Sequence, residues 1–272
     1  MNKITILGCG TSTGVPILGC LCQVCQSTEL RNKRLRTSAL IETSSGKKIL
    51  IDATPDMRTQ LLTNKINELH AAIITHDHAD HTHGIDDLRP FTFVNKQDMP
   101  IYSNEVTAES LKIKFPYIFD REKFFAQKAV LGGGIPLLKQ HIICPGPQKI
   151  LDEDFEFFSL PHGHIHTLAM RHKKLGYIVD CQSIPDEVLK SFRDAKLDIL
   201  IIDCLRPKPH QTHLHLDLTL KYIQAIAPRT SVFTHMGHEW DYLDLIKQVK
   251  ERCSGHVNIF PAIDGQRFFY SN

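Results

Sequence analysis

The 272-residue sequence contains no run of about 20 apolar residues, the length that a helix needs to cross a membrane. Its first residues, Met-Asn-Lys-Ile-Thr-Ile, lack the apolar core of a secretory signal peptide. The formal net charge is only +2, which is too small to attract nucleic acid by charge alone. We therefore expect a cytoplasmic protein with no membrane partner and no stable nucleic-acid partner.

A disulfide framework is not expected either, although the chain has 8 cysteines. Three of them, Cys20, Cys22 and Cys25, lie within a six-residue stretch, where shared metal binding is more natural than bridging. Cytoplasmic thiols also stay reduced. With 42% hydrophobic residues, the chain can bury a core large enough to fold without such staples.

Short apolar runs alternate with helix-like segments, which predicts an α/β fold. We expect strands at 4–7, 38–42, 47–51, 71–74, 101–103, 155–160, 168–171, 176–179, 199–202, 231–233 and 266–270. We expect helices at 55–63 (capped by Thr54), 104–115, 185–195, 217–226 and 240–253. Residues 116–154, which contain Gly132-Gly133-Gly134, read as an irregular insertion within a single domain spanning 1–272.

The loop at 8–16 is punctuated by glycines. It lacks the Gly-Lys-Ser/Thr ending of a phosphate-binding P-loop, and no helix pattern follows it. We favour a tight turn that brings the backbone close to another group, over a phosphate cradle.

Histidines and aspartates gather between Thr75 and Gly84, where four histidines and two aspartates fall within ten residues. This stretch directly follows an apolar strand. Five apolar runs along the chain end in an Asp or a His, namely Asp52, His76, Asp180, Asp203 and His235. Such strands place these side chains along one edge of a sheet, and imidazoles suit Zn, Mn or Fe, so the pattern predicts a metal site.

The spacing within the loop suggests two metals. His76 and His78 alternate, so both can reach one metal from an extended loop, whereas the adjacent Asp80 and His81 suit a second metal. Each metal needs further ligands, and the candidates are His162, His164, Asp180 and His235.

The order Thr-His-x-His-x-Asp-His, then His-Gly, then Asp and Thr-His at two strand ends resembles the metallo-β-lactamase superfamily. The resemblance runs from the first strand to Asp264. It implies an αββα sandwich with a dinuclear metal site at the edge of its two sheets. The ligand sets that it implies are His76, His78 and His162 for one metal and Asp80, His81 and His235 for the other, with Asp180 bridging.

Within this resemblance, Asp52 would orient a ligand imidazole. The His-Gly-x-Ile-x-Thr-Leu spacing favours His162 over His164 as the ligand, although both stay possible. His83, which has no ligand vacancy to fill, is expected behind the ligands or facing the pocket.

Cys20-x-Cys22-x-x-Cys25, together with His238, resembles one branch of the superfamily. That branch contains the phosphoribosyl cyclic phosphate phosphodiesterase of the carbon–phosphorus lyase pathway. The resemblance implies a structural zinc held by three thiolates and one imidazole, a normal closed tetrahedral shell. The alternative is three reduced thiols without a metal.

The segment Pro209-His210-Gln211-Thr212-His213 strengthens this resemblance, because His213 matches the position that faces the substrate phosphate in that branch. Arg89 either reaches a phosphate or pairs with Asp86 or Asp87. The Pro-x-Lys-x-Arg-Asn loop of the tRNA-maturing relative, tRNase Z, is missing.

The resemblance implies a phosphodiesterase acting on a small cyclic phosphate or nucleotide-like phosphodiester. Two catalytic divalent metals, Zn or Mn, would share a bridging hydroxide that attacks phosphorus. The catalytic candidates are Asp80, which would hold the proton of the nucleophile, and His213, which would bind a phosphoryl oxygen or protonate the leaving alkoxide. The alternatives are a thioester or lactone hydrolase and a non-catalytic metal-dependent nucleotide binder. A homodimer is compatible with the resemblance.

Overall fold

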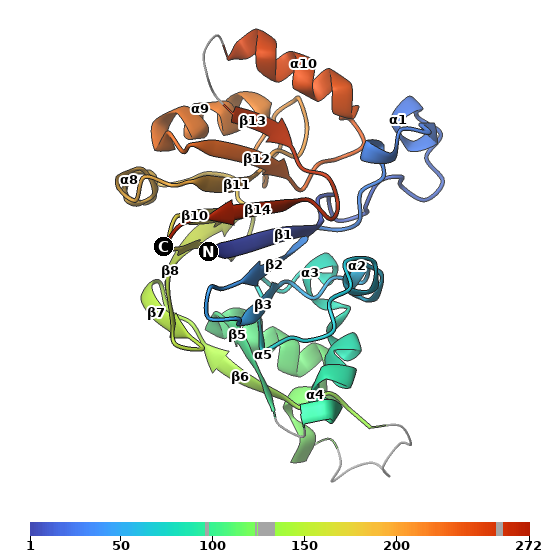
Figure 1. Ribbon diagram of the computed structural model, residues 1–272. Coiled ribbons are helices and arrows are strands. Elements are labelled where there is room, and N and C mark those ends of the chain that lie inside the picture. The colour runs from blue at the N-terminus through green and yellow to red at the C-terminus, as the bar shows by residue number, and fades with distance from the viewer. Residues whose placement is uncertain (96–97, 123, 125–133, 254–257) are drawn as a thin grey trace.

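Two seven-stranded mixed sheets stack face to face with helices on both outer sides, as Figure 1 shows for the computed structural model. The structure describes residues 1–95, 98–122, 124, 134–253 and 258–272. Helices α8 to α10 lie on the outer side of one sheet, and α2, α3 and α5 lie on the side of the other (Figure 1). The predicted αββα sandwich is confirmed.

The order of strands in the first sheet is β14 (Arg267–Tyr270), β1 (Asn2–Gly8), β2 (Ser38–Glu42), β3 (Lys48–Ile51), β4 (Ala71–Ile73), β5 (Met99–Ser103) and β6 (Leu138–Ile142). The order in the second is β13 (Asn258–Pro261), β12 (Thr230–Thr234), β11 (Ile199–Asp203), β10 (Leu175–Ile178), β9 (Ile165–His172), β8 (Glu153–His162) and β7 (Gly146–Ile150). The α-helices are α1 (Gln23–Gln26), α2 (Met57–Thr63), α3 (Ala79–Thr82), α4 (Arg89–Asn95), α5 (Glu105–Lys114), α6 (Pro116–Phe119), α8 (Asp186–Asp194), α9 (Leu216–Ile226) and α10 (Tyr242–Arg252). The described residues also form two 3₁₀ turns, η1 (Leu30–Asn32) and η2 (Ile85–Leu88).

The central strands are apolar along their whole length because both of their faces are buried. In β3, Ile49 and Ile51 belong to the core between the sheets, whereas Leu50 belongs to a second core that also contains Met57 and Leu61 of α2. Continuous apolar runs of this kind are typical of parallel strands covered on both faces.

The parallel strands fix where the polar side chains gather. Strands β3, β4 and β5 run parallel in the first sheet, and β10, β11 and β12 run parallel in the second. In open parallel sheets, ligands bind beyond the carboxyl ends of the strands. Each sheet therefore brings its own strand ends to the site.

Three local features differ from the prediction. Helix α2 begins at Met57, with Asp56 at its cap position, because the Thr54 hydroxyl accepts from the Asp56 N–H and closes a turn before the helix. Helix α9 begins at Leu216 with His215 as its cap. Strand β13 was not predicted, since it has only four residues and ends in a proline.

The segment predicted as an irregular insertion is in part regular. Residues 138–150 supply β6 and β7, which are the outermost strands of the two sheets. Residues 123 and 125–133, which include Gly132 and Gly133, lie outside the described residues. Within the described part of the chain, no helix has the length and apolarity needed to cross a membrane.

Candidate active site and metal centres

The predicted metal ligands come from the carboxyl ends of strands in both sheets. Asp52 follows β3 and His76 follows β4, whereas Asp180 follows β10 and His235 follows β12. The backbone of three of these residues is left-handed, with φ of 63° at Asp52, 54° at Asp180 and 55° at His235. Such conformations are uncommon for residues other than glycine and tend to persist at functional sites.

One cluster consists of His76, His78 and His162. The Nε2 atom of His162 lies 3.2 Å from Nδ1 of His78. His162 donates its Nδ1–H to the carbonyl of Thr212 at 3.0 Å, which leaves Nε2 with a lone pair. The three rings therefore offer nitrogen atoms to one point.

A second cluster consists of Asp80, His81, Asp180 and His235, all of them buried. Asp180 lies between the clusters. One of its oxygens is 2.8 Å from Nε2 of His81 and 3.4 Å from Nε2 of His76, and the other is 3.0 Å from Nε2 of His235. The arrangement suits a bridging carboxylate.

Asp52 holds one imidazole of each cluster. His81 donates its Nδ1–H to Asp52 at 2.7 Å, and the Thr75 hydroxyl donates to the same carboxylate at 2.9 Å. The Thr75 oxygen in turn lies 3.0 Å from Nδ1 of His76. Both rings consequently turn Nε2 toward Asp180, as second-sphere carboxylates do in metal sites.

The clusters fit divalent metal ions because buried polar atoms converge there without hydrogen bonds. In the described part of the chain, the buried atoms without a hydrogen-bond partner include Nε2 of His76, His81 and His235 and Oδ1 of Asp180. Buried polar groups normally find partners. A cation coordinated by these atoms would satisfy all of them.

The local charge also favours cations. Burial by itself would lower the pKa of His81, but the carboxylates of Asp80, Asp180 and Asp52 outweigh burial and raise that pKa well above its usual value. Burial would raise the pKa of Asp80, yet the neighbouring His81 and His235 hold it well below its usual range. Three carboxylates around one buried imidazole create negative potential that a metal ion would neutralise.

His213 and Asp203 form a pair beside the second cluster. His213 donates its Nδ1–H to the fully buried Asp203 at 3.3 Å. Burial would lower the pKa of His213, but the hydrogen bond and charge of Asp203, with Asp180 behind them, raise it to about 9. The other oxygen of Asp203 lies 4.0 Å from Nδ1 of His235. Sequence reasoning gave Asp203 no role, although its position at the end of an apolar strand was the signal.

A cavity of about 350 Å³ opens onto the clusters. Ile165 is the single aliphatic side chain among the described residues that line it, and the others are Ser12, His78, Asp80, His162, Gly163, His164, Asp180, Thr212, His213 and His235. Ser12 comes from the loop at 8–16, so this loop brings part of its chain to the wall of the cavity. Sequence reasoning did not single out Ser12, Ile165 or Thr212, because pocket walls carry no motif.

Three predicted residues lie outside the clusters. His164 is exposed and lines the cavity, so His162 is the one that meets His76 and His78. His83 is exposed and packs edge-on against Phe115, and among the described residues it neither lines the cavity nor contacts a ligand. The Arg89 guanidinium donates to the carbonyl of Gly134, and Arg89 is not among the described residues that line the cavity.

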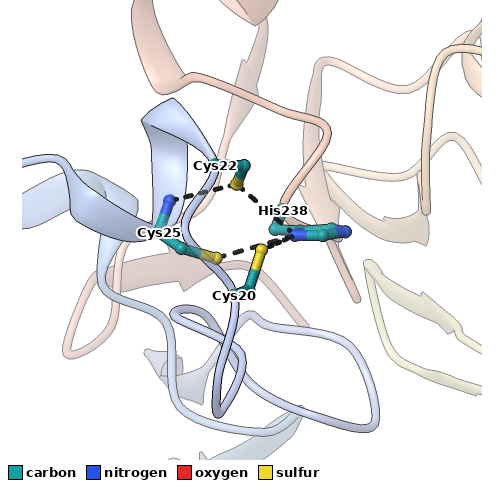
Figure 2. A group of neighbouring side chains, drawn as sticks. All are labelled: Cys20, Cys22, Cys25 and His238. Atoms are coloured by element: carbon teal, nitrogen blue, oxygen red, sulfur yellow. Dashed lines mark hydrogen bonds between the residues drawn. The ribbon is translucent and has the colours of Figure 1, made fainter.

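A separate cluster brings Cys20, Cys22 and Cys25 to His238 (Figure 2). The three sulfur atoms lie 3.3, 3.6 and 3.6 Å from Nδ1 of His238. A tetrahedral zinc with Zn–S of about 2.3 Å and Zn–N of about 2.0 Å places S and N about 3.5 Å apart. The Cys25 N–H donates to Cys22 and lowers the pKa of that thiol to about 6. Burial raises the pKa of the Cys25 thiol to about 11. The fit to zinc therefore rests on the distances between the sulfur atoms and the imidazole nitrogen.

The segment that carries Cys20, Cys22 and Cys25, here called the cysteine lobe, is connected to the cavity through the turn that carries His235 and His238. The Met236 N–H donates to the Cys9 carbonyl at 2.9 Å, and the Thr11 N–H donates to the Met236 carbonyl at 3.1 Å. Buried Arg34 donates to the carbonyls of Gly237 and Trp240. The cavity clusters and the cysteine cluster thus share one stretch of backbone.

Comparisons with known proteins show which chains share this fold. A family model described as "Beta-lactamase superfamily domain" matches residues 47–236. A crystal structure of a new diphosphatase from the PhnP family superimposes with a TM-score of 0.85 at 33% identity, over 99% of this chain and 97% of that one. Zn²⁺-bound PqqB from Methylobacterium extorquens superimposes with a TM-score of 0.73 at 18% identity, over 98% and 99% of the two chains.

A curated relative has a different name. An octanoyltransferase of Porphyromonas gingivalis is 34% identical over 238 residues, which are 87% of this chain but only 46% of the relative. The chain thus spans about half the length of this relative.

Proposed function

This chain belongs to the beta-lactamase superfamily, and from that premise we propose that it is a metal-dependent hydrolase of small phosphoric diesters. The observation that carries the proposal is the position of His213. It lines the cavity next to seven clustered ligand side chains and is held by a buried carboxylate. A protonated imidazole at this place suits a reaction in which an oxygen leaves from phosphorus.

The two ligand clusters would hold two divalent cations, either Zn or Mn, with Asp180 between them. When bound, the metals lower the pKa of water and neutralise phosphoryl oxygens. Every other task falls to the chain. Asp80 accepts the proton of the attacking water. Asp52 orients the imidazole of His81 directly and that of His76 through Thr75.

His213 acts on the leaving side. Its Nδ1–H is engaged by Asp203, so Nε2 is the atom left for the substrate, where it donates a hydrogen bond or a proton to the departing oxygen. The diphosphatase, which is similar to this chain over almost its full length, also supports chemistry at phosphorus. We further propose a structural zinc at the cysteine lobe and a cytoplasmic setting for this chemistry.

The test is hydrolysis of bis(p-nitrophenyl) phosphate and of ribose cyclic phosphates by the metal-loaded protein, before and after chelation. With the ribose cyclic phosphates, whose alkoxide leaving group needs a proton, we expect His213→Ala to lower kcat by about 10²–10⁴-fold, the usual contribution of a general acid. The loss should be smaller with bis(p-nitrophenyl) phosphate, because p-nitrophenolate leaves without a proton. His166→Ala is the matched control, because His166 is an exposed histidine of β9 outside the cavity lining. Equal activity of the His213 variant and wild type on the ribose cyclic phosphates would overturn the proposal.

A second candidate is hydrolysis of a thioester or another carbon-centred ester, which the name of the octanoyltransferase relative favours. The cavity is poorly suited to a long acyl chain, because Ile165 is the one aliphatic residue among the described residues that line it. Turnover of an octanoyl thioester at a higher kcat/KM than any phosphodiester would reverse this ranking.

A further inference from the structure

We propose that the mouth of the cavity holds a second phosphoryl group of the substrate through His210 and His164, so that the preferred substrate is a diester of diphosphate. The inference rests on the proposed phosphodiesterase function and adds a binding site for the leaving group. The metal clusters and His213 account for one phosphoryl group only.

The loop that carries His210 is rigidly built. The Arg206 guanidinium donates to the carbonyls of Lys208 at 3.1 Å and Pro209 at 2.6 Å, which fixes the start of the loop. The carbonyl of Thr212 accepts from His162 at 3.0 Å, which fixes its end to a metal-cluster histidine. A loop anchored at both ends can position a side chain for binding with only a small loss of conformational entropy.

The hydrogen bonds of His210 decide what it offers. Its Nδ1 accepts from the Thr212 N–H at 3.3 Å and lies 3.2 Å from the Thr212 hydroxyl. The ring proton of the neutral imidazole is therefore on Nε2, which becomes a donor. The side chain is exposed, so this donor is accessible.

The imidazoles form a row that leads outward from the metal clusters. The ring centroid of His213 lies 4.8 Å from that of His162 and 5.1 Å from that of His210. A group bound next to His213 on the outer side would therefore reach His210.

His164 reaches the same region from the tip of the β8–β9 hairpin, where it lines the cavity. The hairpin tip and the His210 loop lie side by side, since a Cβ on Gly163 would meet the Thr212 methyl at 3.1 Å. The Gly163 N–H donates to the Gln182 side chain at 3.2 Å, which holds the tip. Two anchored segments, one carrying the cavity-lining His164 and the other carrying His210, thus lie next to each other.

The charge around His210 favours an anion. Burial and then the positive charges of His213 and Arg206 lower the pKa of His210, and the carboxylates of Asp203 and Glu239 oppose this shift less strongly. The two carboxylates that line the cavity, Asp80 and Asp180, belong to the metal clusters. Outside these clusters, the imidazoles and hydroxyls of the wall offer hydrogen bonds to phosphoryl oxygens.

The reaction balances as a hydrolysis. The oxygen of water forms a bond to the phosphorus at the metals, and the bond from that phosphorus to the bridging oxygen breaks. The bridging oxygen leaves on the second phosphoryl group and takes a proton from His213. The two products are phosphate monoesters.

The experiment compares P1,P2-diphenyl diphosphate with bis(p-nitrophenyl) phosphate on the metal-loaded full chain. We expect His210→Ala and His164→Ala each to raise KM for the diphosphate ester about tenfold or more, because each removes a hydrogen bond to a charged group. Values for bis(p-nitrophenyl) phosphate should change less than about twofold, since it lacks the second phosphoryl group. His166→Ala on the same hairpin should behave as wild type with both substrates.

Competition binding supplies a readout that does not need turnover. Inorganic diphosphate should bind the metal-loaded protein about tenfold more tightly than phosphate, and this advantage should disappear in His210→Ala. Equal losses with both substrates, or an unchanged diphosphate advantage, would overturn the inference. Absence of bis(p-nitrophenyl) phosphate hydrolysis by wild type would instead refute the proposed function, while the binding comparison would still report on the mouth.

Discussion

At the scale of single residues, two buried carboxylates orient the histidines of the site through hydrogen bonds. Asp52 fixes His81 directly and His76 through Thr75, whereas Asp203 fixes His213 and approaches His235. Each carboxylate leaves Nε2 of its histidine free for a metal or a substrate. The chemistry of the site therefore depends on residues that touch neither.

We predict that Asp203→Asn shifts the falling, alkaline limb of the kcat–pH profile to lower pH. His213 must carry a proton to donate one, so activity is present below its pKa and is lost as the pH rises through it. Asp203 raises that pKa to about 9, and the neutral amide removes most of the effect. Profiles of the variant and of Asp198→Asn, a surface control bonded to Ser271, would be compared. An unmoved limb would show that Asp203 does not govern His213.

A second prediction concerns Asp52. Replacement by alanine should weaken metal binding at the active site by about 10- to 100-fold, as the loss of an outer-sphere carboxylate typically does. The measurement is competition with a chelator, followed as bound metal per chain. The zinc of the cysteine lobe should be retained, and loss of that zinc as well would point to general unfolding.

At the scale of elements, the cysteine lobe is a short segment with little regular structure of its own, since α1 has four residues. Its exposed Leu18 and Leu21 add little to the core. The proposed zinc would supply the cross-link that apolar packing does not.

We therefore predict that Cys25→Ser lowers the bound zinc by one ion per chain and lowers the melting temperature, while the active-site metals stay. Cys144→Ser is the matched control, because Cys144 is exposed and outside every described ligand cluster. Metal analysis and thermal denaturation decide the outcome. Unchanged zinc content in the Cys25 variant would rule out a zinc at this place.

The same scale shows how far sequence reasoning reaches. Apolar runs that end in Asp or His predicted where strands stop, and the structure brings those ends together. The contacts that could not be predicted depend on the direction in which each side chain points in the folded chain. His83 belongs to the same histidine-rich stretch as His81, yet its ring packs against Phe115. Asp203 was visible as a strand end, but its pairing with His213 follows from a loop path that no spacing encodes.

At the scale of the whole molecule, the site exists only where the two sheets meet. The first sheet brings Asp52, His76, His78, Asp80 and His81, and the second brings His162, Asp180, Asp203 and His235. Metals that join the two halves should stabilise the entire fold. Ligand at about 1,000 times its Kd adds about 4 kcal/mol to the free energy of unfolding. We expect the melting temperature of stripped protein to rise on addition of Zn or Mn, and a Cys25→Ser background would separate this effect from that of the structural zinc.

The most direct test of the central claim is the hydrolysis rate of bis(p-nitrophenyl) phosphate, measured on protein stripped by a chelator and again after metal is restored. We expect the stripped protein to retain no more than about a hundredth of the rate, because the metals both activate water and neutralise the phosphoryl oxygens. Activity should return as the ligand clusters fill, two ions beyond the one at the cysteine lobe. Full activity in the metal-free protein would contradict the claim.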